Sequence, residues 1–583
     1  MTDGALAETA PAAATATRAK PTEGGRGGDQ WWRNAVIYQV YVRSFADGNG
    51  DGIGDLAGVR ARLPYLAELG IDAIWFTPWY VSPLADGGYD VADYRAIDPA
   101  FGTLAEAERL ISEALAVGIR TIVDIVPNHV SDRHPWFQAA LAAAPGSPER
   151  SRFWFRPGRG PKGDEMPNAW VSNFSGPAWT RTTNPDGAPG EWYLHLFSSE
   201  QPDLNWDHPD VRAEHEAVLR FWFDRGVAGV RIDSAALLVK DAALPEIPAS
   251  HAPGAHPNTD RDELHEIYRG WRRVADSYPD ARILVGEIWL PDHDRFAMYL
   301  RPDELHTAFN FDFMVQPWNA GRLRASIDNT MSAHAPVNAP ATWVLSNHDV
   351  TRLVTRYGQE DTAFAFATKR HGVPTDLALG LERARAAALL CAALPGCEYI
   401  YQGEELGLDE VQDLPAERRQ DPMFHRSNGT DPGRDGCRVP LPWSGDRPPF
   451  GFSPAGATDE PWLPQPAGWA ALTVEAETRD PHSMLSLYRA MLRIRRTDPD
   501  LSGNHFRWLP TTADVLAFGR GEDFVCITNL SGQPIELPTG SSIVLSSAEL
   551  SAGLLPPDAT VWLRTAPAMP TDQTSQHRID GGE

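Results

Sequence analysis

The sequence predicts an α/β fold: a (β/α)8 TIM barrel with an inserted domain after strand three and a C-terminal antiparallel β domain. Eight short runs of the chain are mostly apolar throughout, as strands buried on both faces of a sheet are. Helical patterns alternate with these runs, which predicts a parallel sheet that eight such units close into a barrel. Polar residues follow several runs directly, where the active site of such a barrel lies.

The expected strands and helices alternate from the first apolar run onward. The run at 35–45 leads to a helix at 56–70, and the strand at 71–78 is followed by a helix at 103–118. This second helix is predicted to be amphipathic because its apolar residues recur near helical spacing: Leu104, Leu110, Ile111, Leu115 and Val117. The remaining strands are expected at 119–129, 227–234, 281–290, 305–313, 339–349 and 396–405.

Two insertions divide the expected barrel, which covers residues 30–129 and 199–504. Residues 130–198, rich in Pro, Gly, Trp and Asn, form the inserted domain after strand three, and residues 404–480 form a second insertion after strand eight. Short β-rich runs after residue 505 predict the antiparallel β domain, at 505–565. The tails, 1–29 and 566–583, are expected to be disordered because they are polar or rich in small residues and carry no signal-peptide pattern.

Composition excludes several classes of partner. The formal net charge of -26 over 583 residues opposes binding to nucleic acid. No run of about eighteen apolar residues exists, so no membrane span is expected. The 4 Cys lack metal-site spacing, which favours reduced thiols in a cytoplasmic protein. Some of the 20 Trp are expected to present flat faces to a small-molecule ligand. For the oligomeric state, we expect a monomer or a homodimer.

Several polar residues are predicted to meet at one mouth of the barrel. Any one of the 78 acidic residues is most often a surface charge, but a charge directly after a buried strand needs a partner or a task. Three acids and an arginine in one cleft suit glycoside hydrolysis, in which one carboxylate attacks the anomeric carbon and a second acid protonates the leaving oxygen. The strand-end residues are Asp124, Asn128, His129, Arg231, Asp233, Glu287, Asn347, His348, Asp349 and Arg352.

The strand-end motifs "DIVPNH", "GVRIDS", "GEIW" and "SNHD", in this order, resemble those of the α-amylase family of retaining glycosidases, glycoside hydrolase family thirteen. The resemblance covers residues 30–565 or so. It implies a nucleophile at Asp233, a general acid/base at Glu287 and a transition-state stabiliser at Asp349. Substrate contacts around the first glucose ring are expected from His129, Arg231 and His348, and Arg352 is also expected to bind substrate.

Three shorter segments narrow the resemblance to the α-glucosidase and oligo-1,6-glucosidase branch. "QPDLNW", which begins at Gln201, is similar to the segment that marks this branch. "DGGYD" resembles the pocket floor of exo-acting members, which implies that Asp86 and Tyr89 close the end for the non-reducing sugar. "GRDGCRVPLPW" is similar to a loop whose arginine helps to close that pocket, and either Arg434 or Arg438 suits the part.

The segment "DGNGDGIGDL" begins like an EF-hand loop, with oxygen-bearing residues at alternate positions. The twelfth position is Gly58 where an EF-hand has Glu, and a predicted strand precedes the loop, so a calcium switch is not expected. In the branch that the chain resembles, this loop often holds one structural Ca2+ or Mg2+. The implied ligands are Asp47, Asn49, Asp51, the Ile53 carbonyl and Asp55, and no organic cofactor is expected.

The resemblance implies an exo-acting retaining α-glucosidase that hydrolyses terminal α-1,4-linked glucose from maltose and short malto-oligosaccharides through a covalent glucosyl-Asp intermediate. Ser234 favours α-1,4 over α-1,6 substrates, because a bulky Val at this position goes with α-1,6 substrates in the branch. A transglucosylase with a sugar or alcohol acceptor uses the same intermediate and stays an alternative. A trehalose-forming isomerase is the other catalytic alternative, whereas non-catalytic binding members lose the carboxylates that this chain keeps.

Overall fold

The computed structural model describes residues 30–184, 186–364, 366 and 369–565. The two tails expected to be disordered lie outside these residues. Among the residues described, no helix is both long enough and apolar enough to cross a membrane.

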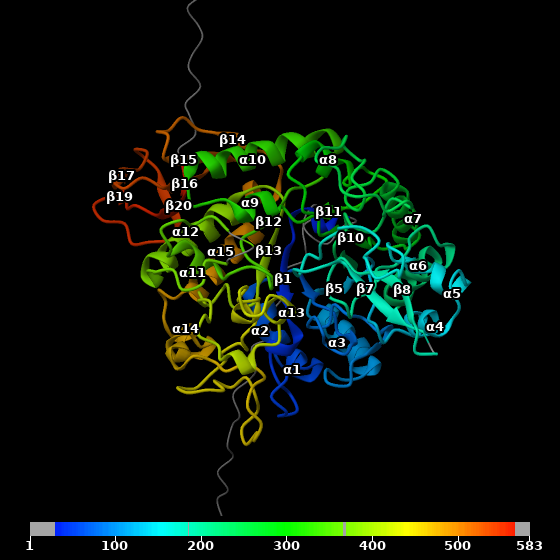
Figure 1. The fold of residues 1–583 in the computed structure, drawn as a ribbon. Helices are drawn as coiled ribbons and strands as arrows, with labels where there is room; N and C mark the ends of the chain where they lie inside the picture. The colour runs from blue at the N-terminus through cyan, green and yellow to red at the C-terminus, as the bar shows by residue number, and fades with distance from the viewer. Residues whose placement is uncertain (1–29, 185, 365, 367–368, 566–583) are drawn as a thin grey trace, which may run out of the picture.

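Eight parallel strands form the centre of the molecule, with helices around them (Figure 1). Their order in the sheet is β11-β10-β9-β5-β2-β1-β13-β12, so each strand pairs with its neighbour in the barrel sequence. β11 and β12 end the ladder, and the Thr307 and Thr342 hydroxyls join them by a hydrogen bond. The predicted TIM barrel is confirmed. The strands are β1 (Val36–Val40), β2 (Ala73–Phe76), β5 (Arg120–Ile125), β9 (Gly229–Ile232), β10 (Ile283–Gly286), β11 (Thr307–Ala308), β12 (Thr342–Val344) and β13 (Cys397–Tyr401).

Helices follow the strands and cover the outside of the barrel (Figure 1). After β1, β2, β5 and β9 come α1 (Leu56–Ala61), α2 (Leu63–Leu69), α3 (Leu104–Ala116), α6 (Pro209–Phe223) and α7 (Leu264–Asp276). After β10, β11 and β12 come α8 (His293–Met298), α9 (Phe311–Val315), α10 (Ala320–His334), α11 (Leu353–Tyr357) and α12 (Leu377–Ala393). After β13 come α13 (Pro422–Arg426), α14 (Val474–Arg479), α15 (Met484–Thr497) and α16 (Pro499–Ser502). The 3-10 turns are η1 (Trp31–Asn34), η2 (Val42–Ser44), η3 (Ala335–Val337), η4 (Ala416–Arg418), η5 (Asp435–Cys437) and η6 (Ala467–Leu472).

Helix α3 shows where the periodicity argument holds and where it fails. Thr103 and Glu106 form a capping box that starts the helix one residue after Thr103. Leu110 and Ile111 are buried as expected. Leu115 and Val117, predicted to lie on the apolar face, are 58% and 47% exposed. The buried stripe of this helix continues through Ala114, and the residue after it turns about 100° away from the barrel.

The sixth strand is much shorter than the sequence predicts. The apolar run at 305–313 contains β11 over two residues only, and helix α9 begins at Phe311. Asn310 ends the extended segment because its side-chain oxygen accepts a hydrogen bond from the Phe313 N–H at 3.0 Å and caps the helix. A short apolar run cannot by itself separate a buried strand from a buried helix start.

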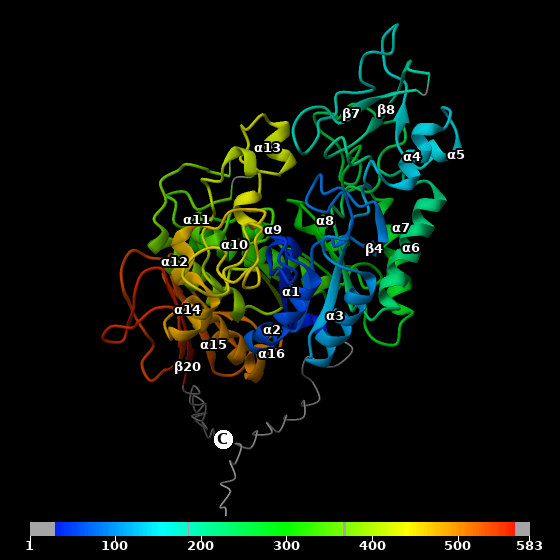
Figure 2. The same ribbon diagram turned by 90° about the horizontal axis from the view of Figure 1, so that it is seen from below.

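The segment between β5 and α6 contains an antiparallel sheet in the order β6-β8-β7, with α4 (Pro135–Ala142) and α5 (Pro148–Ser151) beside it. It has its own apolar cluster, built around Trp154, Trp170 and Trp179. Figure 2 shows this segment and α13 on the same side of the barrel. The strands are β6 (Phe155–Arg156), β7 (Trp179–Thr183) and β8 (Pro189–Leu194), and a hairpin of β3 (Tyr80–Val81) and β4 (Asp93–Ile97) follows β2.

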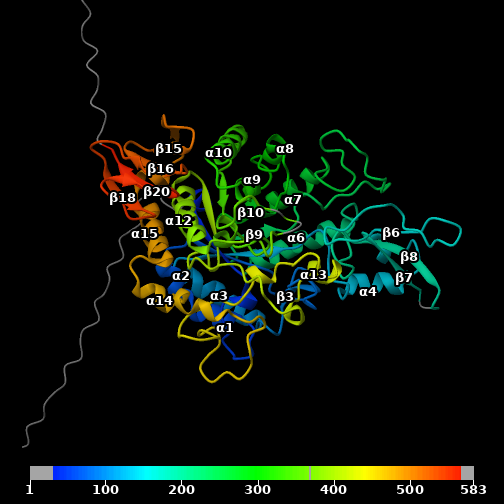
Figure 3. The ribbon, with the colours of Figure 1, turned by 60° about the vertical axis from the view of Figure 1, so that its left-hand side comes forward.

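The C-terminal residues form an antiparallel sheet in the order β14-β15-β16-β20-β18, with β17 and β19 as a separate pair. The sheet packs on helix α12, where the Trp562 indole N–H donates to the Leu389 carbonyl at 3.0 Å. Figure 3 shows this sheet and the β6-β8-β7 sheet at opposite ends of the molecule. The strands are β14 (Arg507–Trp508), β15 (Val515–Arg520), β16 (Phe524–Asn529), β17 (Ile535–Glu536), β18 (Ser542–Ser546), β19 (Leu554–Leu555) and β20 (Ala559–Arg564).

A buried acid in helix α14 makes the stability of the fold depend on pH. Burial raises the pKa of Glu477 to about 8, and its carboxyl oxygen accepts from the Leu485 N–H at 2.9 Å. The folded state therefore holds this proton more tightly than the unfolded chain, so stability falls as the pH rises from about 4.5 to about 8 and then levels off.

We expect Glu477→Gln to remove part of this loss, because Gln keeps the acceptor and has no charge to bury. The melting temperature of the variant should exceed that of the wild type by roughly a degree or two at pH 9 and by less at pH 6. Glu475→Gln, at an exposed position of the same helix, is the matched control. An equal difference between variant and wild type at both pH values would contradict the prediction.

Candidate active site

A cavity of about 660 Å³ lies at the carboxyl ends of the barrel strands. Asp233 follows β9, Glu287 follows β10, and His348 and Asp349 follow the end of β12. The site residues that line this cavity are Asp86, Tyr89, His129, Asp233, Ser234, Glu287, His348, Asp349 and Arg434. Five of the ten residues that the sequence placed at strand ends therefore line one cavity: His129, Asp233, Glu287, His348 and Asp349.

Arg231, on β9, lies beneath the cavity and binds three carboxyl groups. Its Nη1 is 2.8 Å from Asp233 Oδ1 and 3.0 Å from Asp124 Oδ1. Its Nη2 is 2.7 Å from Glu287 Oε2. One guanidinium thus makes the proposed nucleophile and the proposed acid/base neighbours. Arg231 is buried and is not among the residues that line the cavity, so it acts on the carboxyl groups from below.

Burial and like charge oppose full ionisation of the carboxyl groups around Arg231. Burial raises the pKa of Asp233 well above its usual range, the charge of Glu287 raises it further, and Arg231 opposes both effects. Burial also raises the pKa of Asp124 to about 7 in spite of its bond to Arg231. Asp233 and Glu287 are neighbours through Arg231, and a site of this kind can hold one carboxyl group as an anion and another as an acid. Double-displacement chemistry needs both forms at once.

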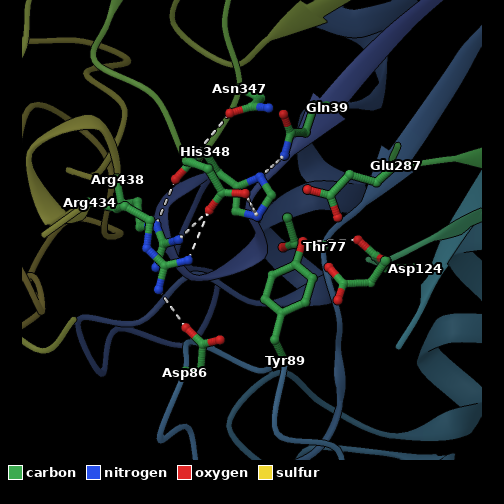
Figure 4. Close-up of polar contacts among 12 residues, drawn as sticks. Gln39, Thr77, Asp86, Tyr89, Asp124, Glu287, Asn347, His348, Arg434 and Arg438 are labelled. Carbon is green, nitrogen blue, oxygen red and sulfur yellow. Dashed lines mark hydrogen bonds and ion pairs between the residues drawn. The ribbon is translucent and has the colours of Figure 1, made fainter. Parts of the chain in front are cut away.

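Asp349 is held as an anion by two arginines from the segment after β13. Arg438 Nη2 lies 2.9 Å and Arg434 Nη1 lies 3.1 Å from its Oδ1. Burial alone would raise the pKa of Asp349, but His348, Arg434 and Arg438 hold it well below its usual range. Because burial lowers the pKa of His348, the two guanidinium groups supply the positive charge at neutral pH. Figure 4 shows these arginines together, across the site from Asp124 and Glu287.

Arg434 also closes one end of the cavity. Its Nη2 is 2.6 Å from Asp86 Oδ1, and its Nε is 2.6 Å from Asp421 Oδ2 (Figure 4 shows the contact with Asp86). Gln201 Nε2 donates to the other oxygen of Asp86 at 3.0 Å. Of the two arginines that the sequence left open, Arg434 lines the cavity. Arg438 does not line the cavity; it is buried and donates from Nε to the His348 carbonyl at 2.9 Å.

Tyr89 and His348 form a flat pair at the floor. Their rings are nearly parallel, at 8°, with centroids 5.3 Å apart. The Tyr89 hydroxyl donates to Asp124 Oδ2 at 3.0 Å. His348 Nδ1 lies 2.7 Å from the Gln39 amide nitrogen, which can only donate, so the ring proton sits on Nε2. Nε2 faces Asp349 at 3.5 Å and is the nitrogen able to donate to a substrate hydroxyl.

His129 is positioned as a neutral ring. Its Nε2 lies 3.0 Å from the Gln201 amide nitrogen, and its Nδ1 lies 3.1 Å from the Asn128 amide nitrogen. Burial lowers the pKa of His129 to about 4. Below this group Lys240 binds Asn128 Oδ1 at 2.6 Å and Asp203 at 2.8 Å. The supporting residues that sequence reasoning did not assign are Gln39, Lys240 and Asp421, none of which belongs to a strand-end motif.

Arg352 does not line the cavity, which corrects its expected place among the substrate contacts. Its Nη1 donates to the Gln402 carbonyl at 3.0 Å and its Nη2 to the Cys437 carbonyl at 2.8 Å. These bonds join the segment after β12 to the two segments that follow β13. The side chain is turned away because buried backbone carbonyls need donors, and Arg352 supplies them.

Ser234 lies between the two catalytic candidates and adopts an unusual backbone conformation. Its φ is 47°, in the left-handed region, and its side chain lines the cavity. Its N–H donates to Glu287 Oε2 at 2.9 Å. A non-glycine residue in this region is uncommon and is most costly for a β-branched side chain. Here the conformation aims the N–H at Glu287.

The loop at 47–56 is closed by its own backbone. Asp47 accepts hydrogen bonds from Gly50 N at 2.6 Å and Gly52 N at 3.0 Å, and Asp55 accepts from Gly58 N at 2.6 Å. Trp462 N donates to the Gly52 carbonyl at 3.0 Å, which ties the loop to the segment after β13. A Cβ on Gly52 would lie 2.2 Å from the Glu460 carbonyl oxygen, so this approach requires glycine.

The oxygen ligands of this loop fit Ca2+ or Mg2+ in kind, since both ions prefer carboxylate, amide and carbonyl oxygen. Within the described part of the chain, no three His, Cys, Asp or Glu side chains converge as a metal site, so the fit does not extend to the arrangement. Each carboxylate oxygen can accept a backbone N–H and keep a second lone pair for a cation. The single ion bound by Asp47, Asn49, Asp51, Ile53 and Asp55 stays a prediction.

Comparison with known proteins identifies the family. The family model for the alpha amylase catalytic domain matches residues 39–503. The chain belongs to the alpha-amylase family. A probable alpha-glucosidase of Rhizobium meliloti (strain 1021) is 37% identical over 534 residues, which cover 87% of this chain and 91% of that protein. An oligo-1,6-glucosidase of Parageobacillus thermoglucosidasius is 34% identical over 561 residues, which cover 89% and 94%.

Solved structures agree with this membership. The alpha-glucosyl transfer enzyme XgtA matches with a TM-score of 0.79 at 34% identity and covers 92% of this chain and 99% of its own. The trehalulose synthase MutB of Pseudomonas mesoacidophila MX-45 matches with a TM-score of 0.78 at 31% identity and covers 92% and 100%. The expectation of a glycoside hydrolase of the alpha-amylase family, with its barrel, is therefore confirmed.

Chelation tests the ion expected in the 47–56 loop. We expect excess EDTA to lower the melting temperature more than it lowers turnover, because an ion that binds only the folded state stabilises it by about 2.7 kcal/mol at a hundred times its Kd. Asp51→Asn should reduce the response to EDTA, since it removes one ligand charge at an exposed position. An unchanged melting temperature, with no divalent metal found by elemental analysis, would show that the loop needs no ion.

Glu287→Gln tests the role of Glu287 as the proposed acid/base. We expect kcat/KM for maltose to fall by about 10²- to 10⁴-fold, because the leaving oxygen no longer receives a proton. For an aryl α-glucoside with a good leaving group the fall should be smaller.

Asp233→Asn is the matched variant for this experiment. It should lose activity on maltose and on the aryl α-glucoside alike, because it removes the attacking oxygen from both reactions. An equal loss of activity on maltose and on the aryl α-glucoside in Glu287→Gln would argue against Glu287 as the acid.

Proposed function

We propose that this protein is an exo-acting retaining α-glucosidase that releases glucose from maltose and short malto-oligosaccharides. The observation that carries the proposal is the double contact of Arg231, which places Asp233 and Glu287 side by side under one cavity. Two neighbouring carboxyl groups at one cavity fit double displacement with retention of configuration. Membership of the alpha-amylase family and the named α-glucosidase relative support the same reaction.

In the proposed reaction, Asp233 attacks the anomeric carbon while Glu287 gives its proton to the departing oxygen. The glucosyl-Asp233 ester then reacts with water, whose proton Glu287 takes, so the second step reverses the first. Asp349, kept anionic by Arg434 and Arg438, accepts hydrogen bonds from the ring hydroxyls. The His348 Nε2 proton is available to one of them.

The closed end of the cavity supports exo action. Asp86, Arg434 and Gln201 form a continuous polar network there, and the carboxylate and amide groups in it can bind the hydroxyls of a terminal glucose. A chain that continued beyond this ring would have to displace the ion pair of Asp86 with Arg434. Breaking a buried pair of this kind costs about 3–5 kcal/mol.

The position of Ser234 supports a preference for α-1,4 linkages. Ser234 lines the cavity next to Glu287, at the wall that meets the departing sugar. Its hydroxyl can donate to and accept from that sugar, whereas an apolar side chain would leave the sugar hydroxyls without partners. One such contact is worth about 10- to 200-fold in kcat/KM.

Product analysis tests the proposed activity. The protein is incubated with maltose, isomaltose, sucrose and trehalose, the products are separated by chromatography, and the anomer first released is identified by NMR. Glucose released from maltose with retention is the expected result. Transfer products or a rearranged disaccharide would favour the transglucosylase or isomerase alternative, the first of which the similarity to XgtA also supports. An inverted first product would overturn the retaining mechanism.

The linkage preference gives a prediction of its own. We expect the wild type to prefer maltose to isomaltose by about 10- to 200-fold in kcat/KM, and Ser234→Val to narrow or reverse the ratio. Val adds backbone strain as well as bulk, because φ at this position is 47°. Ser234→Thr has the same branching but keeps the hydroxyl, so it should retain more of the preference for maltose. A wild type that prefers isomaltose would refute this role of Ser234.

A further inference from the structure

Helix α13 and the inserted segment between β5 and α6 meet beside the closed end of the cavity. Arg426, the last residue of α13, donates from Nε to the Phe174 carbonyl at 3.3 Å and from Nη2 to the Ser175 carbonyl at 2.8 Å. Figure 2 shows α13 on the same side of the barrel as β7 and β8, two strands of this segment. A planar guanidinium that binds two consecutive carbonyls fixes both the distance and the orientation of the two chain segments.

The turn that Arg426 holds, residues 172–176, is built from hydrogen bonds of its own. The Phe174 N–H donates to Ser172 Oγ at 3.0 Å, and the Ser175 N–H donates to the Ser172 carbonyl at 3.1 Å. Ser175 has a φ of 71°, in the left-handed region that non-glycine residues seldom adopt. Backbone strain of this kind persists only where surrounding contacts hold it, and the bond from Arg426 to the Ser175 carbonyl is one of them.

The turn carries Phe174, a buried residue that lines the cavity. Its ring meets that of Phe197 edge-on, with centroids 5.2 Å apart and an angle of 68° between the planes. The guanidinium carbon of Arg434 lies 5.0 Å from the centroid of the Phe174 ring. Phe174 therefore packs against the arginine that binds Asp86 and Asp349. Its ring limits the access of water to these ion pairs, and ion pairs are stronger where water is excluded.

Helix α13 also holds Arg434, through the residue that caps its first turn. Asp421 Oδ1 accepts from the Met423 N–H at 2.8 Å, while Asp421 Oδ2 accepts from the Arg434 N–H at 2.7 Å and lies 2.6 Å from the Arg434 Nε. The cap of the helix thus binds Arg434, and its last residue, Arg426, binds the turn that carries Phe174. These contacts form a closed ring, in which Arg434 and Phe174 are each held by α13 and by each other.

The reacting carboxyl groups have a support that is separate from this ring of contacts. Arg231, on β9, binds Asp233 and Glu287 from below the cavity. Arg426 is half-buried and is not among the residues that line the cavity. A change at Arg426 should therefore alter the sugar-binding end and leave the geometry of the reacting groups in place.

We propose that Arg426 is a positioning residue for the sugar-binding end: it holds Phe174 against Arg434 and so sets the affinity of the site for a terminal glucose ring. This inference rests on the proposed α-glucosidase reaction and adds a residue that acts on the same site. Without the two bonds of Arg426 the strained turn relaxes, Phe174 leaves Arg434, and water reaches the ion pairs at the closed end. Binding of the substrate and of the transition state is then weakened alike, which raises KM and leaves kcat nearly unchanged.

The test measures KM and kcat for maltose, together with the inhibition constant of glucose, in Arg426→Gln. Gln is neutral and too short to make both bonds, so we expect KM and the inhibition constant to rise by the same factor, about three- to thirtyfold. We expect kcat to stay within about twofold of the wild type, because Asp233 and Glu287 keep their places. Arg159→Gln is the matched control and should change neither constant. Arg159 also donates to a carbonyl in the inserted segment, that of Met166 at 2.7 Å, and does not line the cavity.

A double variant tests whether Arg426 acts through Phe174. Phe174→Leu removes the ring and should raise KM by itself, and the addition of Arg426→Gln to it should raise KM little further. Residues that act independently would instead multiply their effects on KM. Arg426→Lys keeps the charge but donates through a single nitrogen, so its KM should lie between those of the wild type and Arg426→Gln. Melting temperatures show whether each variant is folded, and Arg426→Lys gives the same comparison if Arg426→Gln does not fold.

The outcomes separate the inference from the proposed function. An unchanged KM and inhibition constant in Arg426→Gln, with only a lower melting temperature, overturn the inference alone. So do equal changes in Arg159→Gln, a fall in kcat without a rise in KM, or effects that multiply in the double variant. A wild type that releases no glucose from maltose overturns the proposed function. The dissociation constants of glucose from the wild type and Arg426→Gln, measured by titration calorimetry, then decide the inference by themselves, and a wild type that binds no glucose overturns both.

Discussion

The contact of one buried guanidinium with three carboxyl groups organises this active site. Arg231 lies between the rings of Trp75 and Tyr89, 5.1 Å and 5.7 Å from their centroids, and binds Asp124, Asp233 and Glu287. Three ionised carboxylates around one positive charge would leave two charges uncompensated in a buried place. The cheaper state keeps protons on part of the group, which agrees with the raised pKa values of Asp124 and Asp233. The same guanidinium brings the proposed nucleophile and the proposed acid/base together.

The pKa of Asp349 is lowered and not raised, and the residues that lower it come from another part of the chain. Its two arginines belong to the long segment after β13, far from the strand that supplies Arg231. Arg352 and Gly52 tie this segment to the barrel through backbone contacts with Cys437 and Trp462. The correct charge at Asp349 therefore depends on the packing of an insertion, whereas the charges around Arg231 depend on three neighbouring strands. Loops shape such a pocket while the barrel positions the chemistry.

The parts of the site that sequence could predict are those fixed by strand ends. The carboxyl end of each buried strand points to one edge of the barrel, so Asp233, Glu287 and Asp349 had to meet there. The choice between Arg434 and Arg438 could not be made, because both lie in an irregular segment whose path depends on Asp421 and Asp86. Arg352 follows a strand end too, yet buried carbonyl groups draw it away from the cavity. Proximity in sequence to a motif does not say which partner a long side chain will find.

Two predictions about the fold were wrong, and both failed for local reasons. Leu115 and Val117 satisfy an approximate helical period but lie past the stripe that faces the barrel. A count of apolar residues at helical spacing therefore predicts them to be buried, although they are exposed. At 305–313 an apolar run holds both a strand and a helix start, because one polar residue, Asn310, caps the helix. A rotation of about 100° along the helix explains the first error, and a single hydrogen bond explains the second. Amino-acid composition gives information on neither.

Glu287 lies between two halves of the pocket whose walls differ in chemistry. On one side Oε2 belongs to the charged network of Arg231, and the polar partners suit one fixed sugar ring. On the other side Oε1 meets the Trp289 N–H, and the walls are aromatic. Charged contacts with fixed geometry reject small changes in a ligand, whereas an apolar wall accepts many shapes with modest differences in affinity. The half with the charged contacts should thus accept few ligands. In the half beyond Glu287, family members that share the barrel can differ in the molecules that they cleave or extend.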